Sequence, residues 1–151
     1  MAVTRELILR NGQRWILSSA LEPDSGIDRL DACMLVSGQD LPLSSCDRLA
    51  HWAIGGRCPA ISVVAPNANA IEDHVDAILE DREAFEVVTT ADSDLGELED
   101  NVAMVALGMV TSLPLERSTL GADVTFAGTV FVQTDSPELV ESALRSLKLL
   151  D

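Results

Sequence analysis

From residue 32 onwards, short apolar runs of strand length alternate with segments in which apolar residues recur at helical spacing. No internal repeat or low-complexity stretch interrupts this alternation. It predicts an α/β fold in three layers, with a mainly parallel sheet, right-handed crossovers and helices on both faces. The predicted strands are residues 32–36, 59–65, 85–90 and 124–132, and helices begin near residues 44, 69, 94 and 136.

The N-terminal segment carries a hairpin signal. Residues 7–10 and 13–17 resemble strands and flank Asn11-Gly12, a dipeptide that accepts the positive φ angles of a type I′ turn. We therefore expect a β-hairpin that extends the sheet with antiparallel strands.

Residues that favour helix ends accompany the predicted helices. The helix signals are Ser44 or Ser45 for the first helix, which Gly55-Gly56 ends, a capping box of Asn69 and Glu72 for the second, Asp94-x-x-Glu97 for the third, and Ser136-Pro137 for the last.

Gly128 interrupts the last predicted strand and suggests a bulge or a bend.

Length and composition are those of one globular domain. The 151 residues suit a single acidic α/β domain over 1–151, with 47% apolar and 23% charged residues. The N-terminus lacks the apolar core of a signal peptide, and no stretch is apolar enough to span a membrane, so we expect a cytoplasmic protein without a membrane partner. Cys33, Cys46 and Cys58 lack C-x-x-C spacing and are expected to be buried, reduced thiols.

Negative charge is distributed unevenly along the chain. Residues 1–60 carry seven acidic and six basic side chains, whereas residues 61–151 carry eighteen acidic and four basic ones. Residues 72–100 alone hold twelve carboxylates and one base, Arg82. Such a field repels nucleic acid and attracts cations or basic proteins. With two Trp, three Phe and no Tyr, rings for stacking on bases are also few, so we expect no nucleic-acid partner.

Signatures of catalysis are missing from the sequence. Neither G-x-G-x-x-G nor G-x-x-x-x-G-K-[ST] occurs, and the loops after the strands are acidic, which disfavours anionic cofactors. His51 and His74 belong to no recognisable Ser-His-Asp or Cys-His order. A phospho-acceptor receiver domain needs a lysine on a late strand, but the only lysine is Lys148, in the terminal helix. We therefore favour a non-catalytic function.

The carboxyl ends of the predicted parallel strands offer an alternative. Ligands of open α/β sheets bind at this edge, to which the loops 37–40, 65–69 and 90–94 belong. Hard oxygen ligands of the kind that Mg²⁺ or Ca²⁺ accepts are available there. The same residue types also cap helices, which is the competing interpretation. The candidate metal ligands are Asp40, Asn67, Asp92 and Asp94.

Four short motifs between residues 55 and 107 read Gly56-Arg57-Cys58, Ala65-Pro66-Asn67, Glu72-Asp73-His74-Val75-Asp76 and Thr89-Thr90-Ala91-Asp92. This stretch resembles a family of small bacterial α/β proteins of unknown function. The family has histidines at the positions of Glu72 and Asp92 and a tryptophan at Ala91. Any chemistry that depends on those histidines is therefore not expected in this chain.

Three functional hypotheses follow. The first is a non-catalytic domain of the immunity, inhibitor or regulatory type that docks a basic protein. The second is a small divalent-cation-dependent enzyme or ligand-binding domain with its site at the carboxyl edge of the sheet. The third is a homodimer formed through the apolar segment 102–110. For the first, the predicted partner-binding residues are Asp73, Asp76, Glu80, Glu83, Glu97 and Asp100.

Overall fold

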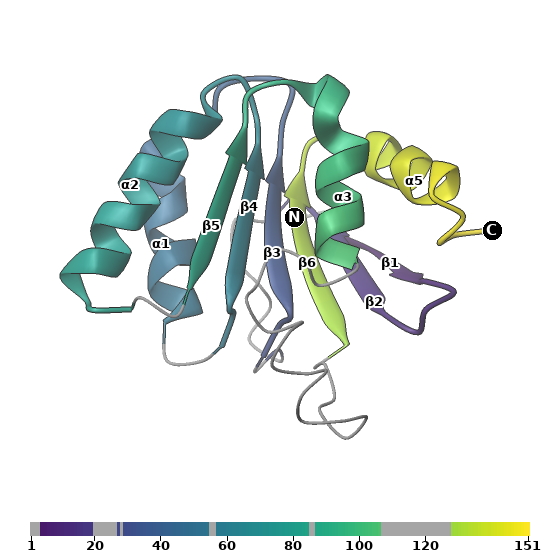
Figure 1. Cartoon of the computed structure of the whole chain (residues 1–151), viewed down its shortest axis with the longest axis horizontal. Helices are drawn as coiled ribbons and strands as arrows, with labels where there is room; N and C mark the ends of the chain where they lie inside the picture. Colours follow the sequence, from purple (N-terminus) through teal and green to yellow (C-terminus); the bar gives the residue numbers. More distant parts are fainter. Residues whose placement is uncertain (1–3, 20–26, 28, 55–56, 85–86, 107–127) are drawn as a thin grey trace.

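The computed structural model describes residues 4–19, 27, 29–54, 57–84, 87–106 and 128–151. Within them, six strands form one sheet in the order β1-β2-β6-β3-β4-β5 (Figure 1). Only β1 is antiparallel to its neighbour, so the predicted mainly parallel α/β fold with an N-terminal hairpin is confirmed. The strands are β1 Thr4–Ile8, β2 Arg14–Ser18, β3 Ala32–Val36, β4 Ala60–Val64, β5 Val88–Asp92 and β6 Thr129–Thr134.

Helices cover both faces of the sheet. Helices α1 (Leu43–Ala53) and α2 (Ala68–Asp81) pack together on one face. Helices α3 (Leu98–Ala106) and α5 (Pro137–Ser146) pack together on the other, and a short 3₁₀ turn, η1 (Leu95–Glu97), precedes α3. Among the described residues, no helix has the length and apolar character needed to span a bilayer.

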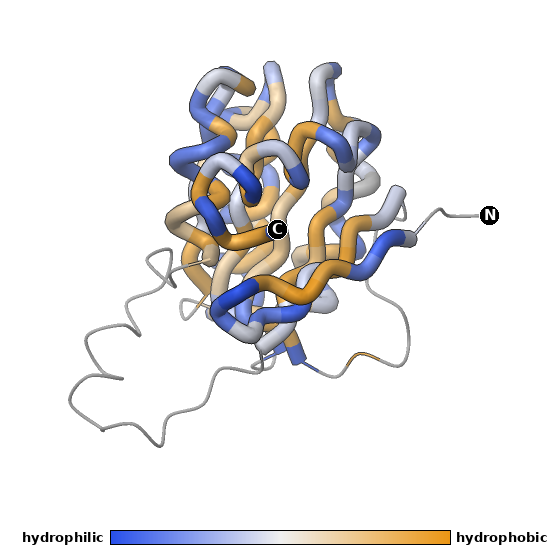
Figure 2. The backbone as a smooth tube through the Cα atoms, turned by 90° about the vertical axis from the view of Figure 1, so that its right-hand side faces the viewer, coloured by the Kyte–Doolittle hydropathy of each residue, from blue (hydrophilic) through white to orange (hydrophobic). Residues whose placement is uncertain are grey.

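Alternation along the strands divides the core between the two faces. On β3, Cys33 and Leu35 belong to the cluster under α1 and α2, whereas Met34 and Val36 belong to the cluster under α3 and α5. The core is largely aliphatic, as the composition requires. Figure 2 shows that the hairpin is hydrophobic along its middle and hydrophilic near its turn and its N-terminal end.

The predicted hairpin is present, but the predicted type I′ turn is wrong. Leu9 N donates to Gln13 O at 2.8 Å and Gly12 N donates to Leu9 O at 3.0 Å, which closes a three-residue loop. Gly12 has a φ of +89°, whereas Asn11 does not have the positive φ that a type I′ turn requires. The Asn11 carboxamide accepts from Gln13 N at 3.1 Å, and this local hydrogen bond stabilises the longer loop.

Two helix starts differ from the sequence prediction. Helix α1 follows Pro42 and has no side-chain cap, so the predicted cap at Ser44 or Ser45 is wrong. Helix α2 begins at Ala68 after Asn67, so the predicted capping box at Asn69 is also wrong. The reason is that the Asn67 carboxamide accepts from Leu41 N at 2.9 Å and donates to Leu41 O at 2.8 Å. This clamp to the loop before α1 fixes where α2 starts.

Two strands are shifted: β1 is Thr4–Ile8 against the predicted 7–10, and β5 also starts at a different residue. The remaining boundaries within the described residues are close to prediction. Strand β5 begins at Val88, three residues after the predicted start, because Val88 N donates to Pro59 O at 2.9 Å and sets the register with β4. Helix α5 begins at Pro137 after Ser136, as predicted. Gly128 has a φ of +83° and lies directly before β6, which begins at Thr129. The predictions for 55–56, 85–86 and 107–127 lie outside the described residues.

Candidate functional site

Helix α2 places a row of carboxylates beside the edge strand β5. Ile71 and Val75 are fully buried against the sheet and fix the rotation of the helix. Side chains four residues apart lie on one side of a helix, so Glu72, Asp76 and Glu80 form a row, here called the α2 row. The row lies next to β5, because Thr89 Oγ1 donates to Asp76 Oδ1 at 2.6 Å.

The predicted partner-binding residues of this region are not equivalent. Asp73, Glu80 and Glu83 are exposed, whereas Asp76 is half-buried and tied to Thr89. Glu83 lies just beyond α2 with a φ of +55°, a left-handed conformation that closes the helix as Ala84 N donates to Leu79 O at 2.8 Å. Asp76 therefore holds α2 to β5 in addition to contributing charge.

Glu72 lies in surroundings that combine partial burial with nearby like charges. Burial raises the pKa of the Glu72 carboxyl, and the charges of Asp76 and Asp73 raise it further. Each of these causes disfavours the ionised form. The α2 row is thus a site where negative charge is already concentrated in the free protein.

A second group of carboxylates lies where β5 ends and α3 begins. Asp94 accepts from Gly96 N at 2.8 Å and caps η1, as the sequence predicts. Asp92 accepts from Asp94 N at 3.2 Å. The pKa of Glu97 is raised by its hydrogen bond to Asp100 first, and then by the charges of Asp100, Asp92 and Asp94. Four acidic side chains therefore share this end of the strand.

The two groups lie on either side of β5. The α2 row belongs to the face covered by α1 and α2, whereas Glu97 and Asp100 extend from η1 and α3 on the opposite face. The predicted residues thus flank an edge strand and do not share one helix face. The acidic edge is the name used below for β5 together with the two groups of carboxylates. These are the α2 row and the group at the end of β5, which comprises Asp92, Asp94, Glu97 and Asp100.

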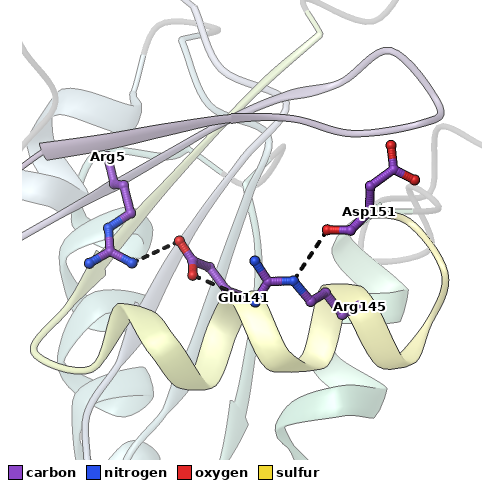
Figure 3. A network of polar contacts seen from close by, with 4 residues as sticks. All are labelled: Arg5, Glu141, Arg145 and Asp151. Atoms are coloured by element: carbon purple, nitrogen blue, oxygen red, sulfur yellow. Dashed lines mark hydrogen bonds and ion pairs between the residues drawn. The ribbon is translucent and has the colours of Figure 1, made fainter.

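Ion pairs in the described chain are concentrated elsewhere. Arg5 Nη1 lies 2.8 Å from Glu141 Oε1, and Arg14 Nη2 lies 2.9 Å from Glu6 Oε2. Figure 3 shows how Arg5 and Arg145 approach Glu141 from both sides. Within the described residues, no arginine or lysine forms an ion pair with a carboxylate of the acidic edge.

Three of the four candidate metal ligands make other contacts in the structure. Both polar atoms of the Asn67 carboxamide are used by Leu41, and Asp94 caps η1. Asp92 accepts from Asn101 Nδ2 at 3.4 Å, and Asp40 is exposed on the loop after β3. Among the described residues, no group of three or more His, Cys, Asp or Glu side chains is placed to hold a metal ion.

A different part of the carboxyl edge has the geometry of a ligand site. Strand β6 lies between β2 and β3, and the helices that follow β3 and β6 cover opposite faces, which makes this pair the topological switch point. Ser37 Oγ donates to Asp135 Oδ2 at 3.3 Å across it. The sequence prediction missed Asp135 because strand order is not readable from spacing. Beside it lies a cavity of about 280 Å³ lined by Arg5, Leu17, Ser18, Ser19, Thr134, Asp135, Pro137 and Glu138.

The histidines and cysteines, the residue types most often used as nucleophiles or bases, lie on or beneath helices α1 and α2. His74 Nε2 contacts Asp47 Oδ1, which joins α2 to α1, and His51 is exposed near the end of α1. The three cysteines are buried, which confirms that part of the prediction. Cys33 and Cys58 lie side by side, with their Sγ atoms 3.6 Å apart.

No protein-family model, no curated protein and no solved structure matches this chain. The resemblance over residues 55–107 therefore stays a prediction.

Proposed function

We propose that this protein is a non-catalytic, cytoplasmic binding domain of the immunity, inhibitor or regulatory type, which docks a basic protein through the acidic edge. The observation that carries the proposal is the set of carboxylates around β5 that have no ion-pair partner among the described residues. The pKa values of Glu72 and Glu97 are raised partly by their acidic neighbours. A cation brought to either group would relieve that repulsion.

Electrostatics also favours this function kinetically. A surface of one sign steers an oppositely charged partner and raises the rate of association, with an effect that salt screens. The net charge of −15 makes such steering strong for any basic protein. Specificity would come from the arrangement of the carboxylates around β5, which fixes where the positive groups of a partner must lie.

The test is affinity capture from cell lysate with three immobilised proteins. These are the wild type, an α2-row variant and a control with the same change of charge on the opposite side. Basic proteins should be retained by the wild type and the control, released between about 0.1 M and about 0.5 M NaCl, and lost with the α2-row variant. The α2-row variant is E72Q/D76N/E80Q, and the control is E6Q/E138Q/D151N.

Retention of neutral or acidic proteins only, unaffected by salt, would contradict the proposal. Equal retention of the same basic proteins by the α2-row variant would also contradict it, because the row would then contribute nothing.

A ligand-binding domain is the second candidate, and the cavity beside the β3–β6 switch point favours it. The ligand would be small, with polar groups facing Thr134 and Asp135, and Mg²⁺ or Ca²⁺ is a candidate cofactor. Thermal unfolding with Mg²⁺, Ca²⁺ or Mn²⁺ at about millimolar concentration tests the cation. A rise in Tm that D135N abolishes would support this candidate, and an unchanged Tm would remove the cation from it.

A further inference from the structure

The edge strand β5 leaves backbone groups directed away from the sheet. Val88 N donates to Pro59 O, and Asp92 O accepts from Ala65 N at 3.2 Å, so these residues turn their backbone groups towards β4. In a strand of a parallel pair, alternate residues turn their N–H and C=O groups to opposite sides. Thr89 and Ala91 therefore direct theirs outwards, and no backbone partner is found for them in the described chain.

Strand β5 is less buried than the inner strands β3 and β4, although the Thr90 hydroxyl is buried. All five of its residues are half-buried, whereas all residues of β3 and β4 are buried. The side chains of Thr89 and Ala91 face α2, and those of Val88 and Thr90 face the side of α3. A strand paired with β5 would thus have one face towards the α2 row and the other towards Val88 and Thr90.

Charge selects what can pair with this edge. The α2 row flanks β5 on one side and four further carboxylates lie at its end, so an extended segment placed there would sit in a strongly negative field. A second copy of the chain would bring two such edges together, which like-charge repulsion opposes. An extended segment with basic residues at alternate positions would direct them all to the α2 side.

We propose that β5 takes up an extended basic segment of the partner as an additional strand, with its lysines or arginines facing the α2 row. This inference rests on the proposed function and specifies its binding mode. Main-chain hydrogen bonds to Thr89 and Ala91 would supply affinity, and the charges would select the segment.

The first test uses a peptide of about eight alternating Lys and Thr residues, with an alternating Glu and Thr peptide as the matched control. Amide hydrogen exchange of the wild-type protein is followed by NMR. At saturation with the Lys peptide, exchange at Thr89 and Ala91 should slow by about tenfold or more, because their N–H groups become hydrogen-bonded. The Glu peptide should leave both amides unchanged.

The second test is the variant Ala91→Pro. It removes an outward N–H, and proline is tolerated on an edge strand where that N–H does not serve the ladder. Affinity for the Lys peptide should fall about tenfold while Tm changes little. The surface control is Ala70→Ser, on the exposed side of α2, which should leave the affinity for the Lys peptide unchanged. A proline control such as Ala77→Pro is unsuitable, because it would break α2.

Failure of this binding mode can be told apart from failure of the proposed function. If the Lys peptide binds but Thr89 and Ala91 exchange as in the free protein, strand addition is wrong and electrostatic docking stands. If the peptide does not bind at all, strand addition is likewise wrong, and the capture experiment alone judges the proposed function. If Ala91→Pro does not fold, the exchange measurement on the wild type decides.

Discussion

The two edges of the sheet carry acidic side chains in opposite electrostatic settings. At the β1 edge, Glu6 and Glu141 are paired with arginines, and the hydrogen bond to Glu141 raises the pKa of Arg5. At the β5 edge, acidic neighbours contribute to raising the pKa values of Glu72 and Glu97. Carboxylates at the first edge form ion pairs, whereas those at the second form none with an arginine or lysine among the described residues and lie close to like charges.

The strands themselves differ in the same way. Strand β1 carries Arg5 and Glu6 in its middle, and charged residues on an edge strand discourage pairing with another chain. Strand β5 has no charged residue before Asp92, its last. The edge protected by charged side chains within the strand is therefore β1, and β5 is the edge that remains able to pair.

The largest expected effect on stability separates the roles of the paired and unpaired acids. The Glu141 side chain is only 13% exposed and lies between Arg5 and Arg145. Glu141→Ala should lower Tm by about 4 °C, because Arg5 and Arg145 both lose an ion-pair partner. Glu80→Ala should leave Tm unchanged or raise it by about 1 °C, because it removes a like charge from the α2 row. Thermal unfolding at low salt measures both, and a loss of equal size in the two variants would contradict the comparison.

Asp76 is the one residue of the α2 row with a structural contact. Asp76→Ala should lower Tm by about 3 °C, because Thr89 Oγ1 loses its acceptor. Asp76→Asn should lower it less, since an amide oxygen can still accept from Thr89 while the negative charge is removed. Circular dichroism melts compare the two, and an equal decrease in both would show that the charge matters to stability more than the hydrogen bond.

Two helices end in a left-handed residue, one near each edge. Glu83 after α2 has a φ of +55° and Lys148 after α5 has a φ of +61°. Glycine adopts this conformation without strain, so both Glu83→Gly and Lys148→Gly should raise Tm, by about 1 to 2 °C. The gain should be larger for Glu83→Gly, which also removes a negative charge next to Glu80 of the α2 row. A larger gain for Lys148→Gly in calorimetry would argue against repulsion there.

The smallest effect is a dependence on pH. The pKa values of Glu72 and Glu97 are raised, so the folded protein binds these protons more tightly than the unfolded chain does. The associated stability is complete below about pH 4, near the ordinary pKa of Glu, and is lost as pH rises through the raised values. E72Q/E97Q should therefore exceed the wild type in Tm at pH 7, with a difference that shrinks towards about pH 5. A difference in Tm that stays the same at every pH would contradict the raised pKa values of these two carboxyls.

Sequence periodicity predicted the fold class because β3 is an uninterrupted apolar run and β4 contains only one polar residue, the buried Ser62. Strands of this composition are typical of a parallel sheet that is buried on both faces. Periodicity did not predict local boundaries that depend on distant contacts. The start of α2 is fixed by Leu41, which lies 26 residues before Asn67, and the start of β5 is fixed by Pro59. Spacing along the chain contains no information about either contact.

The candidate site was predicted in composition but not in arrangement. The carboxylates between residues 72 and 100 were visible in the sequence, yet their division around β5 follows from α2 and α3 covering opposite faces. Asp135 was missed for a related reason, since β6 inserts between β2 and β3. Strand order is set by the packing of the whole domain and therefore could not be predicted from the spacing of residues along the chain.

The most direct measurement is the affinity of the Lys and Thr peptide for two variants of equal net charge, determined by calorimetric titration at low salt. E72Q/D76N/E80Q removes three carboxylates beside β5, and E6Q/E138Q/D151N removes three from the opposite side. The α2-row variant should bind about tenfold more weakly than the wild type, and the control should stay within about threefold. An equal loss in both variants would mean that only total charge matters, and would contradict a docking surface at the acidic edge.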